Sequence, residues 1–204
     1  MWRTIIRSPS SSRFWKYKKK KQLGRKCVGS RKHLFARIKT VEKQRGVRLL
    51  ATLRIVQSAI ENNIRAIRAH TDKRIIAVVK EDGYGVGLRS AYRLYHGQGI
   101  DFFAVATPWE ALQMTEMAEP SESILLLTPV DSVEACAELA ARGVIFMLGS
   151  SEQADILRQA GGRAHCVPRV HLAIDTGLGR YGYIWSDVSA VPRDVQGLKV
   201  EGVY

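Results

Sequence analysis

The sequence predicts an α/β protein with a parallel sheet, and three observations support this prediction. Short apolar runs recur along the chain, each separated from the next by a stretch that can form a helix, which is the rhythm of β/α units. The most apolar runs lack the alternation of half-exposed strands, so both faces of the sheet are expected to be buried. Two of the runs end in polar, glycine-rich segments, and in a parallel β/α barrel such strand ends share the face that carries active sites.

Six candidate strands follow from these runs. They are Ile75–Val79, Phe102–Ala106, Ile124–Leu127, Val144–Leu148, Val170–Ile174 and Lys199–Val203. A helix before the first strand is predicted from about Leu53 to Ala69, with Ile60, Ile64 and Ile67 among its inward positions. Six strands do not close an eight-stranded barrel, so we expect the chain to be an incomplete gene product or a fragment.

Capping signals predict where the later helices begin and end. Thr107–Glu110 combine a capping threonine, a proline in the first turn and an early acid. Asp131–Glu134 has the form of a capping box. Ser151 and Glu152 begin a further helix, which Gly161–Gly162 can end.

The first glycine-rich segment, Val78–Gly87, reads Val-Val-Lys-Glu-Asp-Gly-Tyr-Gly-Val-Gly. Lys80 is the one charged residue at the end of an apolar strand, where water meets a low-dielectric interior. Such a position favours the free amine and makes Lys80 a candidate Schiff-base nucleophile. A lysine that caps the strand with its charge in water is the structural alternative.

The second segment, Val170–Gly182, reads Val-His-Leu-Ala-Ile-Asp-Thr-Gly-Leu-Gly-Arg-Tyr-Gly. It again passes from a strand into a glycine-rich end. Arg180 stands between Gly179 and Gly182, which let the backbone come close to a ligand. Its guanidinium supplies a fixed cation and a rigid set of donors for a phenolate or carboxylate.

Together the two segments resemble the strand-end signatures of the alanine racemases, over roughly residues 50 to 204. The resemblance implies a TIM-type (β/α)8 barrel that binds pyridoxal 5′-phosphate (PLP), with residues 49–204 as its N-terminal part. By this resemblance Lys80 carries PLP and is one of two proton-transfer bases. Tyr84 contacts the cofactor, and Arg180 meets the PLP ring oxygen and the substrate site.

The function implied by the resemblance is that of an alanine racemase. Such an enzyme interconverts L- and D-alanine through a PLP aldimine, here at Lys80, supplies D-alanine for peptidoglycan, and forms a homodimer when full length. Family members place their second base in a β-rich C-terminal domain, so we expect this chain alone to have little or no activity. A racemase of serine or another amino acid, and a noncatalytic PLP-binding protein, are alternatives.

One position departs from the family pattern. Two residues before Asp175, family members commonly carry a lysine, often carbamylated, and this chain has Ala173. The carbamate helps to hold the arginine in those proteins, so the departure bears directly on how Arg180 is positioned.

The charge of the chain is concentrated at its beginning. Residues 1–50 contain 17 lysines and arginines against the single acid Glu42, in a chain of net charge +13. We expect residues 1–48 to be a disordered basic leader, with a nucleic-acid contact or a mitochondrial-type transit peptide as weaker interpretations. No apolar stretch is long enough to span a bilayer, and Cys27, Cys136 and Cys166 lie far apart. We therefore expect a cytoplasmic protein without a metal site.

Overall fold

The computed structural model describes residues 53–204 and confirms an α/β fold with a six-stranded parallel sheet. The strands are β1 (Ala77–Val78), β2 (Phe102–Val105), β3 (Ser123–Leu126), β4 (Ile145–Leu148), β5 (Arg169–Leu172), β6 (Ile174–Asp175), β7 (Tyr183–Ile184) and β8 (Lys199–Val203). The large sheet has the order β1-β2-β3-β4-β5-β8, and all its neighbours are parallel. Strands β6 and β7 form a separate pair beyond the end of β5. All six predicted strands are present, whereas the predicted leader, residues 1–48, lies outside the described residues.

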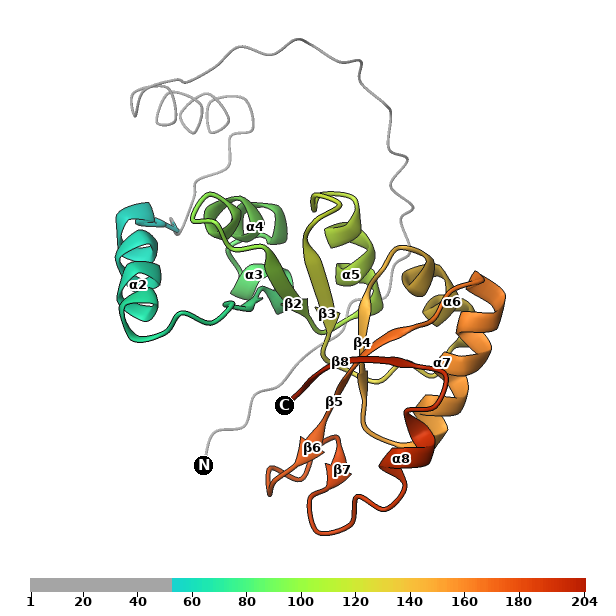
Figure 1. Cartoon of the computed structure of the whole chain (residues 1–204). Helices are drawn as coiled ribbons and strands as arrows, with labels where there is room; N and C mark the ends of the chain where they lie inside the picture. The colour runs from blue at the N-terminus through green and yellow to red at the C-terminus, as the bar shows by residue number, and fades with distance from the viewer. Residues whose placement is uncertain (1–52) are drawn as a thin grey trace, which may run out of the picture. The chain divides into compact units, whose positions relative to one another are not determined.

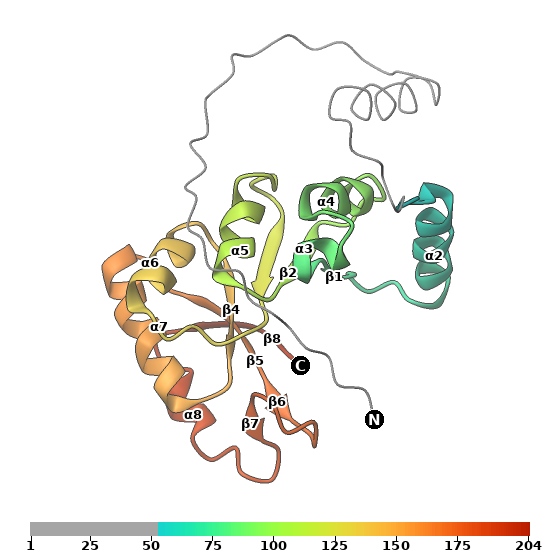
Figure 2. The ribbon, with the colours of Figure 1, turned by 180° about the vertical axis from the view of Figure 1, so that it is seen from behind.

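Helices connect the strands, as the parallel arrangement requires. They are α2 (Gln57–His70), α3 (Lys80–Tyr84), α4 (Leu88–His96), α5 (Pro108–Thr115), α6 (Val133–Ala141), α7 (Ser151–Ala164) and α8 (Val191–Asp194). Figures 1 and 2 show α4 to α7 arranged in an arc along one side of the large sheet. None of the helices between residues 53 and 204 is long and apolar enough to cross a membrane.

The two faces of the sheet bury different side chains, because successive residues of a strand point to opposite sides. One face, with Phe103 and Phe146, packs against the helices. The other, which we call the inner face, carries Phe102, Ala104, Leu125 and Ile145, with Leu127 packed against them. The strand register aligns Ala104 with Leu125, and Leu125 with Ile145. Both faces are therefore buried, as the apolar runs predicted.

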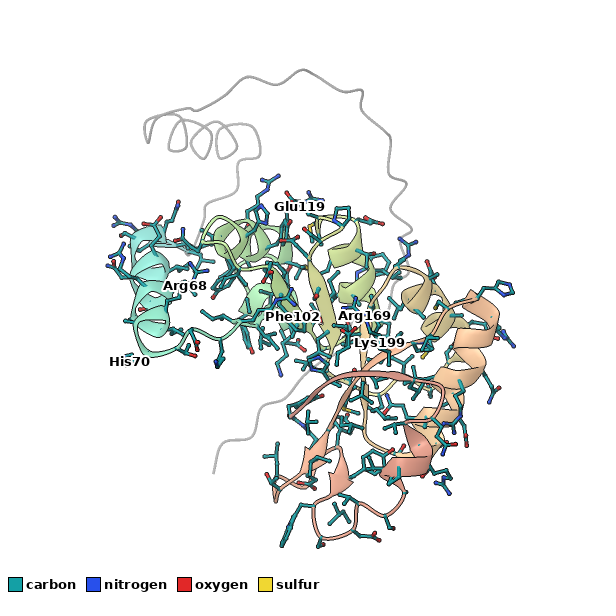
Figure 3. All side chains as sticks on the ribbon, in the orientation of Figure 1. Arg68, His70, Phe102, Glu119, Arg169 and Lys199 are labelled. Atoms are coloured by element: carbon teal, nitrogen blue, oxygen red, sulfur yellow. The ribbon has the colours of Figure 1, made fainter. Side chains whose placement is uncertain are left out.

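An ion-pair cluster lies where β5 and β8 begin. Arg169 donates to both carboxylate oxygens of Glu201, at 2.9 and 2.7 Å, and Lys199 Nζ lies 2.8 Å from Glu201 Oε1. The hydrogen bonds from Arg169 lower the pKa of Glu201 to about 2, against the effect of burial. Figure 3 labels Arg169 and Lys199 in this part of the sheet. The cluster joins β8 to β5 at the end opposite the glycine-rich segments.

The capping predictions have mixed outcomes. The capping threonine of α5 is confirmed, and it forms a complete capping box: Thr107 Oγ1 accepts from Glu110 N at 3.2 Å, and Glu110 Oε2 accepts from Thr107 N at 3.0 Å. Helix α7 begins at Ser151 as predicted. The box over Asp131–Glu134 is wrong, because the cap of α6 is Ser132, whose hydroxyl accepts from Ala135 N.

Two helix predictions are corrected by packing. Gly161–Gly162 do not end α7, which continues to Ala164. A Cβ on Gly161 would lie 2.7 Å from Pro168 Cδ, so this glycine serves close packing rather than helix termination. In α2, Ile64 is buried, but Ile67 is exposed, because this helix buries only a narrow stripe.

Candidate functional site

Lys80 stands at the end of β1, beside the inner face. Val78 is aligned with Ala104 of that face, and Val79 N donates to Ala104 O at 2.8 Å, so the pairing of the two strands continues to Val79. The backbone then leaves the extended conformation, and Lys80, half-buried, begins the next turn. The structure therefore places Lys80 at a strand end, as the sequence predicts.

The turn after Lys80 has a left-handed backbone. Four consecutive residues, Glu81 to Tyr84, have φ values of 53°, 52°, 63° and 54°. Left-handed conformations cost about 1–2 kcal/mol for each residue that carries a Cβ. Three of the four residues carry one, so contacts elsewhere must hold the turn in place. The sequence predicts a glycine-rich turn here, but not its handedness.

Local contacts supply part of this support. Gly83 N donates to Val79 O at 2.9 Å, and Gly87 N donates to Asp82 O at 2.8 Å. The Asp82 carboxylate accepts from Leu88 N at 2.7 Å, which ties the turn to the start of α4. Gly83 is buried, and a Cβ there would lie 2.7 Å from the Cβ of Ala91. The turn is thus packed directly on α4.

Tyr84 is the last residue of the left-handed turn, and its side chain is largely exposed, at 64%. Its φ of 54° is unusual for an aromatic residue. The exposed position leaves Tyr84 accessible to a ligand at this edge. Its contact with a cofactor stays a prediction.

Arg180 lies in the loop between β6 and β7. The Asp175 carboxylate at the end of β6 accepts from Gly177 N at 2.9 Å and from Gly179 N at 3.0 Å. These backbone donors, Gly179 first, lower the pKa of Asp175. At the far end of the loop, a Cβ on Gly182 would lie 2.8 Å from Ala173 O. The glycine therefore lets the two ends of the loop come together.

A cavity of about 180 Å³ lies beside Arg180. Its apolar side chains include Leu127, Met147 and Ala173, from the ends of β3, β4 and β5, and its other residues include Arg180 and Tyr204. Desolvation raises the pKa of Tyr204 to about 12, and the Arg180 guanidinium acts in the opposite direction. The cavity thus combines an apolar lining with a cation.

Ala173 is 3% exposed and forms part of this cavity. No acidic side chain within residues 53–204 forms an ion pair with Arg180. The guanidinium lies over the ring of Tyr181, with its Cζ 5.9 Å from the ring centroid. Such a cation is free to bind an anionic oxygen of a ligand.

The structure places Lys80 and Arg180 at the same edge of the fold without joining them. Strand β1 precedes Lys80, strand β5 leads to the Arg180 loop, and three strands lie between them in the sheet. No hydrogen bond or ion pair links the two side chains in the described part of the chain, and Lys80 does not line the cavity of Arg180. A ligand that contacts both side chains would have to extend across the carboxyl ends of the strands between β1 and β5.

Sequence reasoning missed the part played by two carboxylates. Asp175 was recognised as part of the second motif, but its bonds to Gly177 and Gly179 were not predicted. An aspartate followed by glycines at such short spacing is a signal for this turn. The sequence predicts Glu110 as an early acid in the first turn of a helix, and its further contact with the Lys80 turn, 28 residues away, had no signal in the local sequence.

The fold and this edge define a class: β/α proteins that place their functional side chains at the carboxyl ends of parallel strands. Comparison with known proteins then gives the family. Residues 55–204 match the model described as "Alanine racemase, N-terminal domain", and the chain therefore belongs to that family.

The relatives agree with this assignment. The chain is 29% identical over 153 residues to alanine racemase 1 of Caldanaerobacter subterraneus subsp. tengcongensis, covering 72% of this chain and 39% of that protein. Among solved structures, alanine racemase from Bacillus anthracis with bound L-Ala-P matches with a TM-score of 0.64 at 26% identity, over 72% of this chain and 39% of that chain. Histidine racemase from Leuconostoc mesenteroides subsp. sake matches with a TM-score of 0.62, also at 26% identity, over 71% and 39%.

The match covers most of this chain but less than half of each relative. The chain spans about two fifths of the length of the curated relatives that it matches.

Proposed function

We propose that this chain is the cofactor-binding part of a PLP-dependent alanine racemase, with Lys80 as the cofactor lysine. One observation carries the proposal: a half-buried lysine begins a strained, left-handed turn at a strand end, on the same edge of the fold as Arg180. Strain of this kind persists where the surrounding structure holds it, and it is concentrated at functional sites.

The residues present fit the chemistry of PLP. The cofactor carries an aldehyde, which reacts with an amine, and a phenolate oxygen, which needs a cation or a hydrogen-bond donor. Lys80 supplies the amine, and Arg180, without an acidic partner among residues 53–204, supplies the cation. Tyr84, exposed at the end of the turn, is the proposed further contact. When bound, PLP supplies an electron sink for the negative charge that develops at the substrate Cα.

The work left to the protein is proton transfer, orientation and the exclusion of water. We propose that the Lys80 amine removes a proton from Cα and returns it on one face. Arg180 would hold an anionic oxygen of the cofactor or the substrate. Leu127 and Met147 line the adjoining cavity with apolar surface, which limits access of water to that oxygen. Inversion also needs a proton-transfer group on the opposite face, and we assign none within residues 53–204.

Alanine is the proposed substrate because the matched relatives include alanine racemases. A second candidate is a racemase of a different amino acid. Ala173 favours it: the side chain there is small and lines the cavity beside Arg180, so the wall differs from that of relatives with a lysine at this position. The similarity to a histidine racemase indicates that proteins of this fold accept other side chains.

Borohydride trapping tests the proposal without requiring turnover. The chain is incubated with PLP and reduced with borohydride, which makes the lysine–cofactor bond permanent, and labelled peptides are then mapped. We expect the label on Lys80 and its loss in Lys80→Ala. Lys73→Ala is the matched control, because Lys73 is an exposed lysine paired with Asp72. Label scattered over several lysines, or retained in Lys80→Ala, would contradict the proposal.

A further inference from the structure

We propose that Glu110 is a positioning residue for Lys80: its carboxylate joins the left-handed turn after Lys80 to the end of strand β2. The proposal rests on the proposed function, because it gives Glu110 a role in presenting the amine that binds the cofactor. Glu110 belongs to α5 and does not itself touch the reacting atoms.

The geometry of this carboxylate carries the proposal. Glu110 Oε2 accepts from Ala106 N at 3.1 Å and from Thr107 N at 3.0 Å, both at the end of β2. Glu110 Oε1 accepts from Asp82 N at 3.3 Å, within the left-handed turn. The side chain thus uses both oxygens and bridges two consecutive strand ends.

The burial and charge of Glu110 make this bridge more than a surface contact. The residue is 8% exposed. Burial raises the pKa of Glu110, but the backbone donors of Thr107, Ala106 and Asp82 outweigh it, and the pKa lies below the ordinary value. The group is therefore a buried carboxylate whose charge is satisfied by three N–H groups. Hydrogen bonds to a charged acceptor are stronger than neutral ones.

Within residues 53–204, Glu110 is the one side chain from another β/α unit that hydrogen-bonds to the turn. The other bonds of Glu81–Tyr84 are made inside the segment 79–88. A local segment in a strained conformation relaxes unless something outside it holds it. Glu110 provides that outside attachment at Asp82, which lies two residues after Lys80.

An ordinary helix cap does not explain the contact with Asp82. The capping box of α5 needs Thr107 Oγ1 on Glu110 N and Glu110 Oε2 on Thr107 N. The box uses only Oε2 of the carboxylate, whereas Oε1 accepts from Asp82 N in the turn. Thr107→Ala removes half of the box and leaves the Glu110 carboxylate in place, so this substitution separates capping from positioning.

The experiment compares Glu110→Gln with Thr107→Ala in the 204-residue chain. Glutamine keeps the size of the side chain but loses the charge, and its NH₂ group cannot accept a hydrogen bond. Hydrogen exchange without PLP measures the opening of residues 81–88. The apparent PLP affinity at Lys80 is then measured by borohydride trapping over a series of PLP concentrations.

We expect Glu110→Gln to speed exchange in residues 81–88 by about tenfold. It should also weaken PLP affinity by about tenfold, with β4 and β5 protected as before. Thr107→Ala should change both readouts by less than about twofold. Glu110→Asp keeps the charge with a shorter reach and should give an intermediate PLP affinity, and it replaces Glu110→Gln if that variant does not fold.

Three outcomes would overturn the proposal. Unchanged exchange in Glu110→Gln would mean that Glu110 does not hold the turn. Equal losses in Glu110→Gln and Thr107→Ala would reduce Glu110 to a helix cap. Faster exchange with unchanged PLP affinity would mean that the turn does not position Lys80. A wild-type chain without label at Lys80 would instead defeat the proposed function, while its exchange pattern still reports whether Glu110 holds the turn.

Discussion

The turn after Lys80 and the loop that carries Arg180 lie at the same edge of the sheet, but different contacts hold them. The Lys80 turn is left-handed, is packed on α4 through Gly83, and donates a hydrogen bond from Asp82 N to Glu110 of the next β/α unit. The Arg180 loop is organised by Asp175 at its own start and is closed by Gly182 at its end.

This difference matches the demands of the proposed roles. A group that forms a covalent bond and moves a proton must be placed within a fraction of an ångström, so its segment needs support from outside. A cation that meets an anionic oxygen acts over a longer distance and tolerates a loop without such support. Both segments expose side chains, Leu178 at 77% and Tyr84 at 64%, so attachment rather than exposure distinguishes them. Substitutions in the first segment should therefore cost more stability than those in the second.

The largest effect is expected from Gly83→Ala. The new Cβ would combine a positive φ of 63° with a distance of 2.7 Å to the Cβ of Ala91. We expect the free energy of unfolding to fall by about 3 kcal/mol, from backbone strain and overpacking together. Gly85→Ala is the matched control: φ is 84°, but the new Cβ meets nothing within 4 Å, and about 1 kcal/mol is expected. Urea unfolding followed by circular dichroism measures both. Equal losses would mean that packing on α4 does not hold the turn.

A smaller effect is expected from Asp82→Ala. This substitution removes the acceptor of Leu88 N, the first N–H group of α4, from a partly buried hydrogen bond. Loss of such a bond lowers the free energy of unfolding by about 1 kcal/mol. Asp175→Ala, the corresponding change in the Arg180 loop, should lower the free energy of unfolding measured in urea by less than about 1 kcal/mol, because its carboxylate accepts only from backbone N–H groups of its own loop. If Asp175→Ala proved the more damaging, the proposed difference between the two segments would be wrong.

Much of the fold follows from local patterns. The strands were predictable because runs such as Phe102–Val105 are apolar on both faces, and the start of α5 because Thr107 and Glu110 lie three residues apart. The end of α7 was not predictable, because Gly161 packs closely against Pro168, and that contact exists only in the folded chain. Local patterns are reliable where the deciding contacts lie within one turn or strand.

The candidate site likewise has some features that the local sequence predicts and others that it does not. The strand-end rule predicts that Lys80 and Arg180 share one edge of the sheet, and the structure places Lys80 directly after β1 and Arg180 in the loop between β6 and β7. The left-handed turn was not predicted, because a glycine-rich sequence permits several backbone conformations. The contact of Glu110 with Asp82 requires two β/α units to be side by side, and no single segment contains that information.

Arg180→Ala tests the Arg180 loop directly. Because the side chain is exposed and has no acidic partner among residues 53–204, we expect the free energy of unfolding to change by less than about 0.5 kcal/mol. PLP affinity at Lys80 should nevertheless fall, because the proposed cation is lost. Arg89→Ala, which removes an exposed arginine of α4, should leave that affinity unchanged. A large loss of stability in Arg180→Ala would show that the guanidinium supports the fold instead.

The smallest effect is expected from acid titration of the two carboxylates, Glu110 and Asp175. Both have a pKa below the ordinary value: for Glu110 the backbone donors outweigh the effect of burial, and for Asp175 the N–H of Gly179 contributes most. A depressed pKa means that each carboxylate favours the folded state above its ordinary pKa, about 4.3 for Glu and 3.9 for Asp. That contribution is lost as the pH falls through the lower, folded-state value.

Amide chemical shifts measured by NMR between pH 6 and pH 2 distinguish the two segments. Gly177 and Gly179 should follow the protonation of Asp175, with a midpoint below about 3.9. Asp82 should follow Glu110, with a midpoint below about 4.3. Protonation of Glu110 should also broaden the signals of residues 81–84, because the turn loses its outside support, while protonation of Asp175 should leave those signals sharp. Midpoints at or above the ordinary values would contradict the assigned hydrogen bonds. If residues 81–84 responded to Asp175 instead, the two strand ends would be coupled and could not be regarded as separately supported.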